Sequence, residues 1–348
     1  MNLYLISEEQ RAYYEVEVLN KKGIFSSVYL VLIIVVLSSV PSFLDDRFFN
    51  TAQAHSATIP VGNLPHDIKY DPTNKNIYVV NTASSTVSVI SGSTNSVIAT
   101  TLVGWVPVWL VYVPSNNKIY VTNEGPNDVY VINAATNKVI KAIAVGSQPF
   151  GIAYDHTNNS VYVTNFQNDT ISVINAATDV VVSTIPLRTS YSSTSPILLT
   201  YVSDNDALYV SKDPQEVSVI NAVTNAAVNH MKVDGNPAGS AYNPTNHNIY
   251  VTKFSSNQVS VINTITNSVV ANIPVGDFPT DIVYNPVNHN MYVTNQGSNT
   301  VSVIDSTTNS VIGTIPVGTK PIGITYDTSN NHIYVANAGS NTVTIIHP

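Results

Sequence analysis

The sequence has 348 residues, of which 44% are hydrophobic and only 10% are charged, and it contains no cysteine. This hydrophobic fraction supports a folded core, while the absence of cysteine excludes disulfides, zinc–thiolate sites, iron–sulfur clusters and a cysteine nucleophile. The net charge of -8 argues against a general nucleic-acid binder.

An uncharged apolar run near the N-terminus predicts a membrane anchor or a signal sequence. Residues 24–44 form this run, which is about as long as the ~20 residues that cross a bilayer as a helix. Two lysines precede it, so the positive-inside rule keeps residues 1–23 cytoplasmic and exports the rest. The alternative is a signal sequence cleaved after the A-x-A-like site at 52–54. Both interpretations place most of the chain outside the cytoplasm.

Residues 45–56 form a linker, and from residue 57 onward the sequence repeats itself. Each copy contains four short runs rich in Val, Ile, Tyr and Thr, separated by turns rich in Asn, Gly and Pro. Four strands in ~40–45 residues are typical of one β-propeller blade. A tetrapeptide that starts with Tyr-Val marks each copy, and it begins at Tyr78, Tyr120, Tyr162, Tyr209, Tyr250, Tyr292 and Tyr334.

Seven copies fill residues 57–348 and predict an all-β, seven-bladed propeller. The last copy stops after its third strand, and the missing fourth strand is present at the other end, at residues 57–62. We therefore expect the N- and C-terminal strands to pair, which closes the ring and removes the open edge of a linear stack.

The repeat resembles the 40-residue YVTN-type β-propeller family of extracytoplasmic microbial proteins. The tetrapeptide YVTN stands at 120–123, 162–165 and 292–295, with VG-x-x-P and V-x-V-I elements beside it. The resemblance covers residues 57–348 and implies a propeller. Relatives of that family include cell-surface and surface-layer proteins and, more distantly, propellers of redox enzymes and a lyase that opens streptogramins.

Two residue types that suggest chemistry are explained by the repeat. Fourteen of the twenty tyrosines occupy two fixed positions in each copy, and we expect them to pack between blades. His247, His289 and His332 fall in the same turn of successive copies, so they spread around a ring and cannot converge on one metal ion. We therefore expect no metal site and no cofactor.

Two aspartates indicate a candidate site at the mouth of the central channel. Asp67 and Asp281 each follow the repeat proline by two residues, where the innermost strands begin, and His66 precedes the first. These side chains predict either a water-filled entrance or a site for a cation or a hydroxylated ligand.

The fourth copy departs most from the repeat and predicts a second candidate site. It carries a five-residue insertion that contains Arg188 and Tyr191, and copies four and five replace the closing Asn of the motif with Lys212 and Lys253. Three cations and an aromatic ring could form a patch for an anionic or glycan partner. The alternative is drift of a degenerate blade, with both lysines pointing to water.

The sequence contains no P-loop, nucleophile elbow or dinucleotide-binding fingerprint, and no catalytic residue is assigned. We expect a non-enzymatic, membrane-anchored, extracytoplasmic propeller that binds a cell-envelope protein or glycan. The alternatives are a secreted or periplasmic-type propeller with lyase or redox-auxiliary activity, and a small-ligand carrier. Asn158 and Asn168 match the glycosylation pattern, and no nucleic-acid partner is expected.

Overall fold

The computed structural model describes residues 57–187 and 195–348, which form one all-β unit of seven four-stranded sheets. The predicted helix at 24–44 lies outside these residues. Within the described part of the chain, no helix is long and apolar enough to cross a membrane.

Each blade is an antiparallel sheet whose strands follow one another in chain order, except that β1 joins the last blade. The strands of blades one to three are β2 Pro65–Asp71, β3 Asn76–Asn81, β4 Thr86–Ser91, β5 Ser96–Leu102, β6 Pro107–Val113, β7 Lys118–Asn123, β8 Asp128–Asn133, β9 Lys138–Ala144, β10 Pro149–Asp155, β11 Ser160–Asn165, β12 Thr170–Asn175 and β13 Val180–Pro186. Those of blades four to seven are β14 Pro196–Val202, β15 Ala207–Lys212, β16 Glu216–Asn221, β17 Ala226–Lys232, β18 Pro237–Asn243, β19 Asn248–Lys253, β20 Gln258–Asn263, β21 Ser268–Pro274, β22 Pro279–Tyr284, β23 Asn290–Asn295, β24 Thr300–Asp305, β25 Ser310–Pro316, β26 Pro321–Asp327, β27 His332–Asn337, β28 Thr342–Ile346 and β1 Thr58–Pro60. Two short 3-10 helices are η1 Thr82–Ser84 and η2 Ser203–Asn205.

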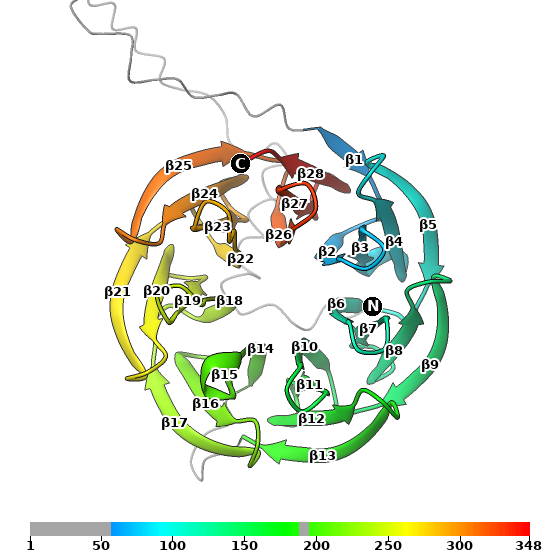
Figure 1. Cartoon of the computed structure of the whole chain (residues 1–348), viewed down its shortest axis with the longest axis horizontal. Coiled ribbons are helices and arrows are strands. Elements are labelled where there is room, and N and C mark those ends of the chain that lie inside the picture. The colour runs from blue at the N-terminus through cyan, green and yellow to red at the C-terminus, as the bar shows by residue number, and fades with distance from the viewer. Residues whose placement is uncertain (1–56, 188–194) are drawn as a thin grey trace, which may run out of the picture. The chain divides into compact units, whose positions relative to one another are not determined.

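The blades stand around a central opening, with the first strand of each blade innermost and the fourth at the outer rim (Figure 1). This arrangement confirms the predicted seven-bladed propeller.

The ring closes by pairing of the two ends of the propeller. Strand β1 runs antiparallel to β28, with Ile59 opposite Val343, and the two strands lie side by side in Figure 1. The amide of Ile345 also donates a hydrogen bond to the carbonyl of Ala57 at 2.9 Å. The predicted closure is therefore confirmed, although the strand is three residues long.

Left-handed residues explain why each repeat turns where it does. The turn between the third and fourth strands ends on Asn or Asp with φ between 50° and 56° in six blades, because short Asx side chains tolerate this conformation. These residues are Asn95, Asn137, Asp179, Asn225, Asn267 and Asn309.

The hydrophobic core lies between blades and not within them. Six of the seven apolar clusters combine residues from two neighbouring sheets, and the cluster around Trp109 also includes Leu198 of a third sheet. In one of them, Ile59 and Ile68 from the start of the propeller pack with Tyr334 and Ile345 from its end. Both faces of each blade are therefore buried, which explains the almost continuous apolar runs of the inner strands.

The scaffold tyrosines link adjacent blades through their hydroxyl groups. The Tyr250 hydroxyl has two acceptors in the next blade that share its single hydrogen, the carbonyl of Ser306 at 3.2 Å and Oδ1 of Asn309 at 2.8 Å. Tyr284, on an innermost strand, bonds Thr245 of the preceding blade at 3.0 Å. The predicted packing of the tyrosines between blades is confirmed.

Candidate functional site

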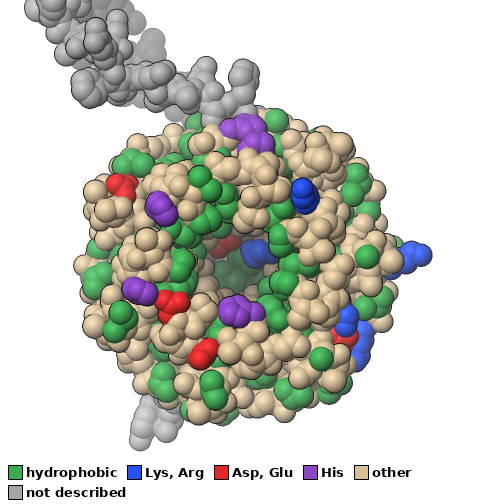
Figure 2. All heavy atoms as spheres, viewed as in Figure 1, with side chains coloured by type: hydrophobic (Ala, Val, Ile, Leu, Met, Phe, Trp, Pro, Cys, Tyr) green, Lys and Arg blue, Asp and Glu red, His purple; other side chains and the backbone are tan. Residues whose placement is uncertain are grey.

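A cavity of about 180 Å³ occupies the centre of the ring, and the innermost strands of all seven blades contribute to its lining. Figure 2 shows the opening from one face, with acidic and basic side chains at its bottom. Lys69 and Asp281 are the charged residues of this lining, and Trp109, Ile152 and Leu198 supply apolar wall.

Asp67 lies at this channel but is fully buried and engaged. Its Oδ2 atom accepts the backbone N–H of Leu110 in the next blade at 3.0 Å, and its Oδ1 atom accepts a hydrogen bond from Lys69 at 2.7 Å. A glycine in the preceding blade makes room for it, since a Cβ on Gly323 would lie 2.8 Å from the Cα of Asp67. The carboxylate therefore joins blades as well as carrying charge.

Asp281 holds the equivalent place in blade six, and it is 6% exposed. Its Oδ2 atom accepts a hydrogen bond from the backbone N–H of Ile324 in blade seven at 3.3 Å. Its Oδ1 atom accepts one from the backbone N–H of the next residue, Ile282, at 2.9 Å. Burial raises the pKa of Asp281 to about 6, and the charge of Asp67 adds to the rise while Lys69 opposes it. Within the described part of the chain, Asp281 forms no salt bridge.

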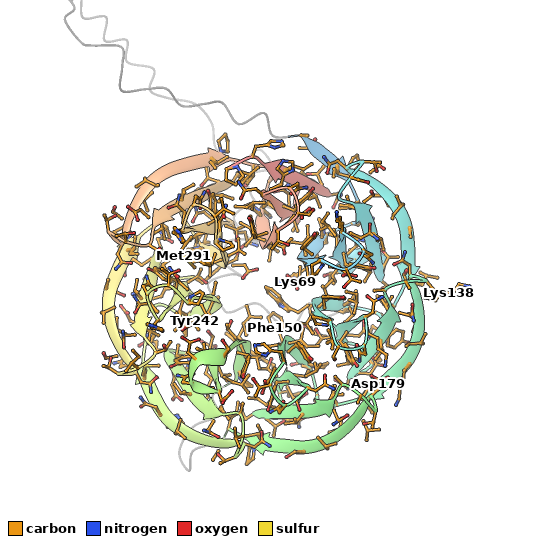
Figure 3. The ribbon with its side chains drawn as sticks, viewed as in Figure 1. Lys69, Lys138, Phe150, Asp179, Tyr242 and Met291 are labelled. Atoms are coloured by element: carbon orange, nitrogen blue, oxygen red, sulfur yellow. The ribbon has the colours of Figure 1, made fainter. Side chains whose placement is uncertain are left out.

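Lys69 is the cation that connects the two carboxylates electrostatically. Burial disfavours its charge, but the negative charges of Asp67 and Asp281 outweigh this effect and raise the pKa of Lys69 above its usual value. The ammonium group also lies 5.5 Å from the centre of the Trp109 ring, in cation–π range. Figure 3 places Lys69 beside the central opening.

Aromatic residues surround His66 at the same channel. Its Nδ1–H donates to the carbonyl of Val108 at 3.1 Å, which fixes the tautomer, and its ring meets Trp109 and Phe150 edge-on. Burial lowers the pKa of His66, partly offset by Asp67 and the Val108 carbonyl. His66 is therefore a neutral donor at physiological pH, and Phe150 lies beside the opening in Figure 3.

A larger cavity of about 410 Å³ lies between blades four and five. Its charged pair is His247 and Asp204, with Nδ1 and Oδ2 2.8 Å apart, and the hydroxyl of Tyr242 donates to the same carboxylate. Other blades use these positions for the same inter-blade bond between a turn and a tyrosine, as in Thr157 and Tyr201. The repeat already explains the polar groups of this cavity.

The structure does not place the two motif lysines on an exposed patch. Lys212 and Lys253 are almost completely buried, and their ammonium groups bond Glu216 and Asp234, each at 3.0 Å. Each lysine is buried and paired with a carboxylate, although Asp234 itself is 71% exposed, so neither ammonium group lies on an exposed patch as the sequence suggested. Arg188 and Tyr191 lie outside the described residues.

The three repeat histidines lie in or directly after the turns between the first and second strands. His247 and His289 occupy left-handed turn positions, and His289 bonds the Tyr284 hydroxyl at 2.8 Å. His332 lies one position later than predicted, at the start of β27, where it faces His347 at 2.8 Å. Among residues 57–187 and 195–348, no group of three or more His, Asp or Glu side chains could hold a metal ion.

Sequence reasoning identified the two aspartates but missed Lys69 and the role of Trp109. A signal was available, because the position of Lys69 holds Val, Ala or Thr in the other six innermost strands. A single charged residue in a column of small or apolar residues indicates a special local environment.

Comparison with known proteins supports the fold. A family model described as a YNCE-like β-propeller matches residues 22–327. Hydrazine synthase of Kuenenia stuttgartiensis superposes with a TM-score of 0.74 at 20% identity, over 82% of this chain and 96% of that chain. A streptogramin B lyase superposes with a TM-score of 0.72 at 16% identity, over 84% of this chain and 97% of that chain. Among curated proteins, no sequence matches.

Proposed function

This chain belongs to the YNCE-like β-propeller family, and we propose that it is a non-enzymatic binding module anchored outside the cytoplasmic membrane. Its partner in this proposal is a protein or glycan of the cell envelope, and its anchor is the segment 24–44. We assign its repeat to the YVTN type, on the tetrapeptide that recurs in every blade.

One repeated surface feature carries this proposal. The third residue of the outermost strand is a β-branched aliphatic in six blades, and each of these side chains is between 51% and 59% exposed. Isolated exposed aliphatics are common on soluble proteins, but these recur at one position per blade around the circumference. We call this set the rim residues, and they are Ile98, Ile140, Val182, Val228, Val270 and Ile312.

The chemistry of the rim favours lateral contact with a neighbour. Polar residues such as Thr100, Asn272 and Thr314 accompany the rim residues on the outermost strands, which suits a protein or glycan surface better than a lipid one. In blade seven, whose outermost strand β1 spans only Thr58–Pro60, the equivalent position lies outside the described residues.

Replacing all six rim residues with Thr tests the proposal, because Thr keeps the β-branched shape and removes apolar surface. We expect an unchanged melting temperature and reduced recovery of the protein with the cell envelope after detergent solubilisation of the membrane. The control replaces three aliphatics outside the rim that are even more exposed, Val223, Ile265 and Val287, with Thr. Equal envelope association of the rim variant and the control would contradict the proposal.

A second candidate function is lyase or redox-auxiliary activity, and one observation favours it. The carboxyl group of Asp281 has a pKa of about 6 in a cavity that also contains Lys69, and this pKa is suited to general acid–base chemistry near neutral pH. The structurally similar streptogramin B lyase makes lyase substrates a first choice for a screen. This function would be supported if the natural chain turns over a substrate and the Asp281→Asn variant does not.

A further inference from the structure

We infer that the central channel binds a small zwitterion, with its carboxylate at Lys69 and its ammonium group at Asp281. This site is independent of the rim residues and of the partner proposed for them.

The channel leaves one negative charge uncompensated. Asp67 and Lys69 form a pair at 2.7 Å, so their charges cancel. Asp281 is buried and receives only backbone N–H groups in the described structure, so its carboxylate has hydrogen bonds but no cation in contact. A buried carboxylate of this kind is stabilised by an ammonium group that reaches it.

Lys69 has hydrogen-bond donors that the described residues do not use. An ammonium group has three N–H donors, and among the described residues Lys69 bonds only Asp67. Its side chain is 31% exposed and lines the cavity, so the remaining donors are accessible from the channel. An oxyanion of a ligand can accept them.

A bound zwitterion would complete an alternation of charge along the channel wall. An amine without a carboxylate would bring a second positive charge close to Lys69, and an anion without an ammonium group would face both aspartates. A zwitterion avoids both repulsions, because each of its charges meets the opposite charge in the wall. The order of charges then alternates from Asp67 through Lys69 and the ligand to Asp281.

The walls limit the ligand's size and character. The cavity of about 180 Å³ has room for roughly six water molecules at ~30 Å³ each, so only a small molecule enters it. Trp109, Ile152 and Leu198 give the ligand's carbon atoms an apolar surface. Trp109 is 7% exposed, and its indole N–H is buried without a hydrogen-bond partner in the described structure.

Isothermal titration calorimetry of the full-length chain tests this inference with ligands that differ in one group. Glycine, β-alanine and γ-aminobutyrate carry both charges at increasing separation, while ethylamine and propionate carry one each. We expect at least one zwitterion to bind about tenfold or more tighter than both single-charge ligands. No binding of any zwitterion at about 10 mM, or equal binding of ethylamine or propionate, would overturn the inference.

Variants locate the site. Asp281→Asn and Lys69→Met should each weaken zwitterion binding by about tenfold or more, because each removes one half of the charge complement. Lys118→Met is the matched control, since it removes a lysine from a comparable pair with Asp179 that lies away from the channel. Wild-type affinity in both channel variants would place any binding elsewhere and overturn the inference.

A fluorescence readout does not depend on these variants folding. The chain has two tryptophans, so Trp105→Phe leaves Trp109 as the only one. Binding in the channel should change the emission of Trp109 with the same affinity that calorimetry gives. Calorimetric binding without any change in this emission would contradict a site at Lys69.

Discussion

The ammonium group of Lys212 lies 3.0 Å from the carboxylate of Glu216, and together these residues replace an Asn–Thr pair of the repeat. In four other blades the motif's closing Asn donates to a Thr five residues later. Blade four has therefore exchanged a neutral hydrogen bond for a charged one at the same buried place. Blade five differs, because Lys253 pairs with Asp234 of the loop between β17 and β18 and also donates to Asn272, each at 3.0 Å.

The exchange in blade four predicts strong coupling between its two residues. Glu216→Ala leaves the buried ammonium of Lys212 with only the Leu187 carbonyl, at 3.4 Å, and we expect a loss of about 3 kcal/mol in the free energy of unfolding. The double variant Lys212→Asn with Glu216→Thr restores the repeat pair and should recover most of this loss. Urea denaturation measures the free energy of unfolding of both variants. If the double variant is no more stable than Glu216→Ala, the Lys212–Glu216 pair does not substitute for the Asn–Thr pair of the repeat.

The inter-blade tyrosines predict a smaller and separable effect. Tyr250→Phe removes one hydroxyl and leaves the Ser306 carbonyl without that donor, so we expect a loss of about 1–2 kcal/mol. Tyr130→Phe is the control, since the Tyr130 hydroxyl makes no hydrogen bond within the described structure. Urea denaturation that gave the same loss for both variants would indicate a packing effect and not the inter-blade bond.

The fold was predictable because the same pattern of strands and turns recurs in seven copies. Each copy carries the same strands and turn residues, so a weak local pattern becomes strong through repetition, and closure follows from where the first and last copies begin and end. Tyr78 and its equivalents have one role for the same reason.

The candidate site was only partly predictable, because burial depends on neighbours in other blades. Asp67 and Asp281 stood out as polar residues at an inner position. In contrast, Lys212 and Lys253 are buried beside acidic partners, Glu216 and Asp234. At the sequence level, the lysines were considered without these partners. The contact of Lys69 with Trp109 joins two blades, and no local pattern contains it.

Asp281 predicts a specific dependence of stability on pH. Its pKa is about 6 in the folded chain and about 4 when unfolded, so the folded state binds more protons between these values. Its contribution to stability therefore falls as pH rises through this window. Asp281→Asn lacks this penalty, and its stability relative to the natural chain should rise by about 2 kcal/mol from pH 4 to pH 7. Parallel pH profiles in urea denaturation would contradict the raised pKa.

Closure of the ring predicts the effect of a short truncation. A chain that starts at residue 63 lacks β1 and Ile59, which is 5% exposed and belongs to the core between blades seven and one. We expect it to be less stable by about 3 kcal/mol than a chain that starts at residue 57, because it also leaves β28 as an unpaired edge. Calorimetric melting compares the two, and equal melting temperatures would show that β1 adds nothing.

Site-specific photo-crosslinking in intact cells tests most directly whether the rim meets a partner. A photoreactive amino acid replaces Val270 on the rim or Ile265 in the adjacent turn, two exposed aliphatic positions on the same blade. We expect a discrete crosslinked species with an envelope protein or glycan at position 270 and none at position 265. The same crosslinking pattern at both positions, or none at either, would contradict a binding function of the rim.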